Sequence, residues 1–198
     1  MRFHPTAAVL AAALAGVLGV TARSAPQSQA PAGPASASAT ESNPAGDIPD
    51  TQAFVTATGP SGKYQLQVPE GWAESRHGTS VSYTDKLNSI SVDEMLATAA
   101  PTLQSVTGQE VPQLKSSTSN FAIKDVTAFT LPGGTGTLIR YQADSTPDPV
   151  TGKVRRQALE RYLFWKNGTR ADLTLAGPQG ADNADPWAKV SGSFRWLK

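Results

Sequence analysis

Alternating apolar and polar positions predict a series of strands between residues 63 and 175. The clearest is residues 63–68, where Tyr64, Leu66 and Val68 alternate with polar neighbours, as in a half-buried strand. Pro69 and Gly71 end it, because proline has no ladder donor and glycine favours a turn. The same pattern predicts six further strands, around Val81 and Tyr83, around Ile90 and Val92, and at residues 126–131, 134–143, 153–165 and 169–175.

Two helices are predicted to pack on this sheet. The first covers residues 98–106, with Thr98 as its N-cap and Pro101 in its first turn. Residues 107–120 are polar and predict no definite element.

The second helix begins near the C-terminus. Asp185 is the predicted N-cap and Pro186 the first helical residue, and the helix presents Trp187, Val190 and Phe194 on one face. Together the elements predict an α+β domain over residues 53–198, an antiparallel β-sheet with helices packed on its faces.

The first 24 residues have the three parts of a signal peptide. A short basic start containing Arg2 precedes an apolar run at residues 7–20, and small residues follow. As a helix this run would span about 21 Å at ~1.5 Å per residue, short of a hydrocarbon core of ~30 Å. Cleavage fits after Ala22 or Ser24. We expect an exported protein, secreted or in the extracytoplasmic cell envelope, without a permanent membrane span.

No lipid anchor is expected, and a linker follows the leader. Val17-Leu18-Gly19 resembles the start of a lipobox, but Val20 stands where lipidation needs a cysteine. Residues 25–52 are rich in alanine, proline and serine, with Ile48 as their only large aliphatic residue. Such a segment buries too little apolar area to offset the entropy of ordering it, so a disordered linker that is dispensable for folding is predicted.

Charge and composition exclude several classes of function. The chain has 17 basic and 16 acidic side chains, and removing Arg2 and Arg23 with the leader leaves 15 against 16. A net charge near −1 gives little attraction for nucleic acid. There is no cysteine, and His77 is the only histidine after the leader, so multi-histidine and thiolate metal sites are excluded. We assign no catalytic, cofactor-binding or metal-binding residue, and we expect no cofactor and no enzyme activity.

One loop resembles a phosphate-binding loop without its essential residues. Gly152-Lys153 matches the end of that motif, but Pro147 and Val154 stand where it needs a glycine and a hydroxyl. A loop that enters a strand is the better interpretation.

One acidic cluster resembles a cation site. Asp182, Asn183 and Asp185 offer oxygen ligands, but Trp187 and Ser193 occupy the positions of the glycine and the bidentate glutamate of a calcium loop. A helix cap is the better interpretation.

Basic residues concentrate in one predicted strand and its turn, at Lys153, Arg155, Arg156, Arg161 and Lys166. Alternation places Arg155 and Arg161 on one face, and Arg156 with Glu160 on the other. This division predicts a solvated sheet face in place of a phosphate-binding patch.

Four tryptophans are candidates either for the core or for recognition: Trp72, Trp165, Trp187 and Trp196. Trp187 shares a helix face with Val190 and is predicted to be core. Trp72 lies beside a turn and Trp165 at a strand end, so these two could line a groove, although core filling is favoured.

Several motifs between residues 54 and 198 resemble the PsbP-like family, and within it the LpqN-type lipoproteins of actinobacteria. They are Tyr64-x-Leu66-x-Val68-Pro69-x-Gly71-Trp72, Pro132-Gly133-Gly134 before a long strand, Arg161-Tyr162 with Asn167-Gly168 in a hairpin, and Ser193-Phe194-Arg195-Trp196. The resemblance implies an antiparallel sheet flanked by helices and an extracytoplasmic, non-catalytic role in binding or assembly. Val20 departs from the lipoprotein pattern.

Three kinds of function remain open. The first is an exported, non-catalytic binding or assembly protein whose partner is an envelope protein, a glycan or a lipid. The second is a carbohydrate- or lipid-binding module that uses exposed tryptophans. The third is a hydrolase that uses carboxylates such as Asp182 and Asp185.

Overall fold

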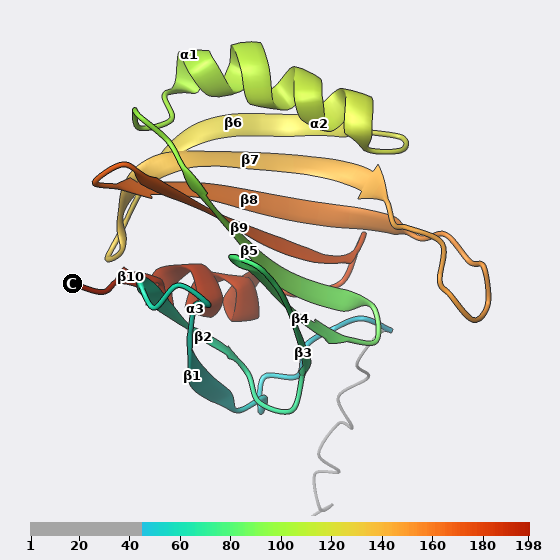
Figure 1. Ribbon diagram of the computed structural model, residues 1–198. Coiled ribbons are helices and arrows are strands. Elements are labelled where there is room, and N and C mark those ends of the chain that lie inside the picture. Colours follow the sequence, from blue (N-terminus) through green and yellow to red (C-terminus); the bar gives the residue numbers. More distant parts are fainter. Residues whose placement is uncertain (1–44) are drawn as a thin grey trace, which may run out of the picture. The chain divides into compact units, whose positions relative to one another are not determined.

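A seven-stranded antiparallel sheet forms the centre of the fold in the computed structural model, which describes residues 45–198 (Figure 1). Across the sheet the order is β3-β4-β5-β9-β8-β7-β6. The strands are β3 (Ala73–His77), β4 (Ser80–Asp85), β5 (Asn88–Leu96), β6 (Ala122–Leu131), β7 (Gly134–Asp144), β8 (Arg156–Lys166) and β9 (Thr169–Pro178).

A second layer closes one face of this sheet. It consists of β1 (Phe54–Thr58), β2 (Tyr64–Pro69), α3 (Ala184–Ser193) and β10 (Arg195–Trp196), with strand order β1-β2-β10. The main core lies between the two layers. Phe194 is fully buried there and stacks on Phe164 at 4.1 Å and on Tyr64 at 5.4 Å between ring centroids.

The opposite face carries a helical layer along β6, β7 and β8 (Figure 1). The layer is α1 (Leu103–Ser105), a π-helical turn (Val106–Glu110) and α2 (Val111–Ser117). Val106 is fully buried against Ile139, Tyr141 and Leu163 of the sheet.

The antiparallel α+β prediction is confirmed, and the seven predicted strands are present with shifted ends. Strands β1, β3 and β10 were not predicted, since β3 in particular is exposed along its whole length and has no apolar alternation. Asn167 and Gly168 both have positive φ in the turn between β8 and β9, which confirms the predicted hairpin.

Both predicted ends of the helix at residues 98–106 are wrong. The helix starts after Thr102, whose side chain accepts a hydrogen bond from Ser105 N–H and forms a capping box. It then continues to Ser117, because Val111 N–H bonds to Val106 O, five residues back. This π-turn inserts one residue between the apolar positions and hides the helical period in the sequence.

The predicted N-cap of the second helix is also wrong. Helix α3 begins at Ala184, so Asp185 lies inside its first turn, where a negative charge favours the helix dipole. Asn183 precedes the helix, but its side chain bonds to Ile48 N–H, Gly46 O and the side chain of Asn88. The Trp187–Val190 face packs on the core as predicted, and Phe194 ends the helix there.

The end of the predicted linker is part of the fold. The signal peptide and the linker up to residue 44 lie outside the described residues. Residues 45–52 do not behave as a linker, because Ile48 is only 5% exposed and its N–H donates to Asn183 Oδ1 at 2.8 Å. No helix in the described part of the chain is both long and apolar enough to cross a membrane.

Candidate functional site

On the side of the sheet that faces the helices, one row of side chains changes from hydroxyl-bearing residues at β3 to an apolar residue at β7. Reading across β3, β4, β5, β9, β8 and β7, the paired residues are Ser75, Ser82, Ser91, Thr174, Arg161 and Ile139. A neighbouring row contains Thr84 and Ser89. We call the surface formed by Ser75, Ser82, Thr84, Ser89, Ser91 and Thr174 the hydroxyl face.

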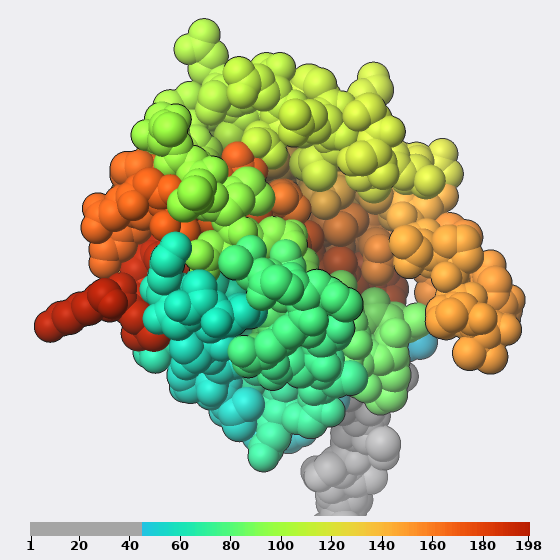
Figure 2. Space-filling model, in the orientation of Figure 1, coloured from blue at the N-terminus to red at the C-terminus, as the bar shows by residue number. Residues whose placement is uncertain are grey.

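The hydroxyl face remains open to solvent. The helical layer packs on β6–β8, whereas Ser82, Ser89, Ser91 and Thr174 stay half-buried and Ser75 is exposed. Figure 2 shows the molecule hollowed between α2 and β5, with β8 and β9 at the bottom of the hollow. A surface lined with short hydroxyl side chains therefore lies beside a helical wall.

A network of four charges borders the hydroxyl face. Asp172 is fully buried in β9, and its carboxylate binds Arg161 Nη2 at 2.7 Å and Arg170 Nε at 2.6 Å. Arg170 Nη1 also donates to Glu110 Oε1 at 2.6 Å. The charges of two arginines and two carboxylates thus balance each other. Asp172 needs such partners, because a buried carboxylate without a counter-charge would lower the stability of the fold.

The π-turn places Glu110 in this network. Its hydrogen bond from Arg170 lowers the pKa of the Glu110 carboxyl, because the bond favours the charged form. Arg161 Nη1 donates to Thr174 Oγ1 at 3.1 Å, while Arg161 Nε is buried without a partner among the described residues. The network joins the helical layer to the edge of the hydroxyl face and holds both carboxylates in ion pairs.

A pocket of about 440 Å³ adjoins the network. It is lined by Arg170, Glu110 and Gln109 together with the chain that leads into α1. Its lining contains no residue of the hydroxyl face.

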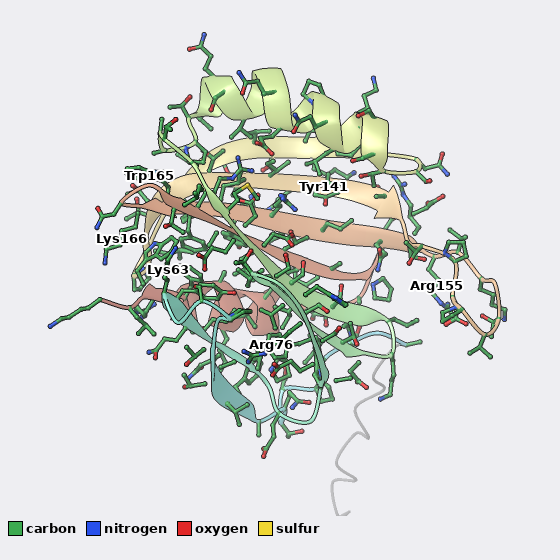
Figure 3. The ribbon with its side chains drawn as sticks, in the orientation of Figure 1. Lys63, Arg76, Tyr141, Arg155, Trp165 and Lys166 are labelled. Carbon is green, nitrogen blue, oxygen red and sulfur yellow. The ribbon has the colours of Figure 1, made fainter. Side chains whose placement is uncertain are left out.

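The tryptophans do not form an exposed aromatic surface. All four are half-buried, and Trp72, Trp187 and Trp196 pack against the main core. Trp165 donates its Nε1–H to Ala97 O at 2.9 Å and lies near the end of β8 (Figure 3). Trp72 does line a groove of about 320 Å³ with residues 45–49, as the sequence allowed.

The acidic cluster serves the packing of residues 45–48. Asp182 N–H donates to Asp47 Oδ1 at 2.9 Å, and Asn183 is buried against Ile48. Within residues 45–198, no group of three or more acidic or histidine side chains is arranged to hold a metal ion.

The basic residues of the predicted strand separate into different environments. Arg161 and Glu160 lie on opposite faces, as alternation predicted, but Arg161 is half-buried in the ion network instead of lying on a solvated sheet face. Strand β8 starts at Arg156, which pairs with Asp144, so Lys153 and Arg155 belong to the preceding loop. No local pattern indicates that Arg161 pairs with Asp172 of the next strand, since that pairing depends on the register of β8 and β9.

Comparisons with known proteins support the fold assignment. No family model matches the sequence, and no curated protein matches it. The solution structure of cyanobacterial PsbP (CyanoP) from Synechocystis matches with a TM-score of 0.52 and 15% identity, covering 78% of this chain and 100% of that chain. The fold is therefore PsbP-like, as the sequence motifs predicted.

Two further solved structures are similar at a lower level. LpqN of Mycobacterium tuberculosis, described as involved in cell envelope biogenesis, has a TM-score of 0.42 and 16% identity, covering 75% of this chain and 93% of its own. The Ran-binding protein Mog1p of Saccharomyces cerevisiae has a TM-score of 0.47 and 11% identity, covering 73% and 96%. At these identities, the similarity concerns the fold alone.

Proposed function

We propose that the protein is an exported, non-catalytic binding protein of the cell envelope or its surroundings. Its ligand is a hydroxyl-rich molecule of the glycan class, which lies across the hydroxyl face. The observation that carries this proposal is the row of Ser75, Ser82, Ser91 and Thr174 that ends at Arg161 beside the helical layer.

The chemistry of the row suits a glycan. Each serine or threonine hydroxyl both donates and accepts hydrogen bonds, which matches the hydroxyls of a sugar. Neighbouring strands lie ~4.8 Å apart, so the row offers evenly spaced partners along an extended ligand. The predicted leader supports an extracytoplasmic location.

A non-catalytic role is supported by the state of the two carboxylates in the charged network, while Asp93, the partner of Asp172 across the sheet, takes part in none of the ion pairs found among residues 45–198. Asp172 and Glu110 are each bound to an arginine. An ion-paired carboxylate is a weaker proton acceptor than a free one, which does not suit a general base. Asp182 and Asp185, the carboxylates considered for a hydrolase, lie at the start of α3, away from this network in the sequence and on a different layer.

The test is a binding measurement with soluble glycan fragments released from the envelope of a producing organism. The secreted chain is compared with Ser91→Leu, which places a branched aliphatic group in the middle of the row. Ser116→Leu is the matched control, because Ser116 is an exposed serine on α2. We expect Ser91→Leu to weaken binding by at least about tenfold, the loss of one or two hydrogen bonds, and Ser116→Leu to leave it unchanged.

The proposal fails if the fragments do not bind, or if the two leucine variants bind them equally well. Capture of an envelope protein by the hydroxyl face, in the absence of glycan binding, would favour the assembly role instead.

A further inference from the structure

A second cavity lies where the hydroxyl face meets the long loop between β7 and β8. It has a volume of about 320 Å³ and opens between residues 145–157 and the turn that joins β4 to β5. Thr84 and Ser89 of the hydroxyl face belong to its lining. The loop projects beyond the sheet and carries Arg155 (Figures 1 and 3).

The cavity has an excess of positive charge. Its lining contains Lys86, Lys153 and Arg155 against a single acidic residue, Asp148, so three positive charges face one negative charge. The ion pairs found among residues 45–198 do not involve Lys153 or Arg155. Lys86 lies 3.7 Å from Asp85 with both side chains exposed, a weak pairing.

The one carboxylate in the lining is already engaged. Asp148 Oδ1 accepts hydrogen bonds from Val150 N–H at 3.1 Å, and from the N–H and hydroxyl of Thr151 at 2.7 and 2.8 Å. Asp148 therefore shapes the tip of the loop.

Backbone hydrogen bonds hold the main chain of Lys153 and Arg155 in the loop. Ser145 N–H donates to Arg155 O at 2.8 Å, and Asp148 N–H donates to Lys153 O at 3.0 Å. These bonds extend the pairing of β7 and β8 into the loop. The backbone of both residues is thus fixed at the cavity that Lys86 also lines, and their exposed side chains take part in no ion pair among residues 45–198.

We propose that this cavity binds the phosphate group of a phosphorylated, hydroxyl-rich ligand. Lysine and arginine both bind phosphate oxygens through charge-assisted hydrogen bonds, and the Ser89 and Thr146 hydroxyls supply further donors. The inference deepens the proposed function, because Thr84 and Ser89 connect the phosphate cavity to the hydroxyl face. A sugar phosphate and a lipid phosphodiester present the same group to this cavity.

The experiment titrates the secreted chain with inorganic phosphate, with glucose 1-phosphate and with phosphatidylglycerol vesicles. Lys153→Gln and Arg155→Gln are compared with Lys166→Gln, a matched control at the far end of β8, where the lysine is exposed. Each cavity variant is expected to weaken phosphate binding by about tenfold, since a charge-assisted hydrogen bond contributes about 1.5–3 kcal/mol. Added salt should weaken binding further. The control should bind as the original chain does.

The outcomes separate the two proposals. If neither phosphate nor vesicles bind, or if Lys166→Gln weakens binding as much as the cavity variants, the phosphate cavity is refuted. If phosphate binds through Lys153 and Arg155 but Ser91→Leu leaves glycan binding unchanged, the cavity stands and the glycan proposal falls. Glucose 1-phosphate binding in preference to vesicles identifies a sugar phosphate, and the reverse identifies a lipid headgroup.

Discussion

The two faces of the central sheet are built by the same strands but serve different purposes. In β5, Ile90 and Val92 point into the main core and are fully buried, while Ser89 and Ser91, which alternate with them, lie on the hydroxyl face. The second layer covers the first face over β4, β5, β9 and β8, whereas the helical layer covers the other face only along β6, β7 and β8. We therefore expect stability to depend mainly on the covered face, and the proposed binding to depend on the open one.

The largest expected effect is on the covered face. Phe194→Ala should lower the free energy of unfolding by about 3–5 kcal/mol, the usual cost of removing a buried aromatic ring. The ring lies between Phe164 and Tyr64, so its loss leaves a cavity in the middle of the core. Denaturant unfolding measures the change, with Asp185→Ala as a variant that should cost at most about 1 kcal/mol. If Phe194→Ala left the free energy of unfolding nearly unchanged, the covered face would not be the main source of stability.

A smaller effect is expected where residues 45–52 join the domain. Ile48→Ala should lower the free energy of unfolding by about 2 kcal/mol, the low end for such truncations, because the side chain is buried at the margin of the fold. Ile123→Ala is the matched control, since Ile123 is 44% exposed. Equal melting temperatures for both variants would restore the original prediction that the linker extends to Gln52.

A still smaller effect is expected at the charged network. Glu110→Gln should cost about 1 kcal/mol at neutral pH, because it breaks a partly buried ion pair with Arg170. The folded-state pKa of Glu110 lies below its ordinary value of 4.5, so its contribution is present above pH 4.5 and is lost as the pH falls through the folded-state pKa. Unfolding curves should therefore converge for the original chain and the variant in acid. Glu70→Gln, at an exposed residue, is the control, and a difference that persists in acid would exclude this linkage.

The sequence predicted those features that depend on local patterns. Alternation at Tyr64, Leu66 and Val68 identified a buried strand, and Asn167-Gly168 identified the hairpin. The features it missed depend on contacts between distant residues. Ile48 is held by a hydrogen bond to Asn183, 135 positions away, and Arg161 pairs with the buried Asp172 because the register of β8 and β9 brings the two side chains together.

The candidate site was harder to predict than the fold. The serines of the hydroxyl face come from separate strands, and each alone is an ordinary solvent-facing residue of an antiparallel sheet. Lys153 and Arg155 were predicted to lie in a strand with Arg161, but β8 begins only at Arg156. Their position at the same cavity as Lys86 depends on the conformation of the loop, which the periodicity of apolar residues does not predict.

The most direct test of the central claim is to add glycan fragments to the purified chain and map their binding by NMR chemical-shift changes. We predict the largest chemical-shift changes at Ser82, Ser91 and Thr174 on the hydroxyl face, and no changes in the second layer. The groove between β2 and α3, lined by Gln65 and Lys189 among others, serves as the internal reference. Changes concentrated in that groove, with the hydroxyl face silent, would contradict the assignment of recognition to the open face of the sheet.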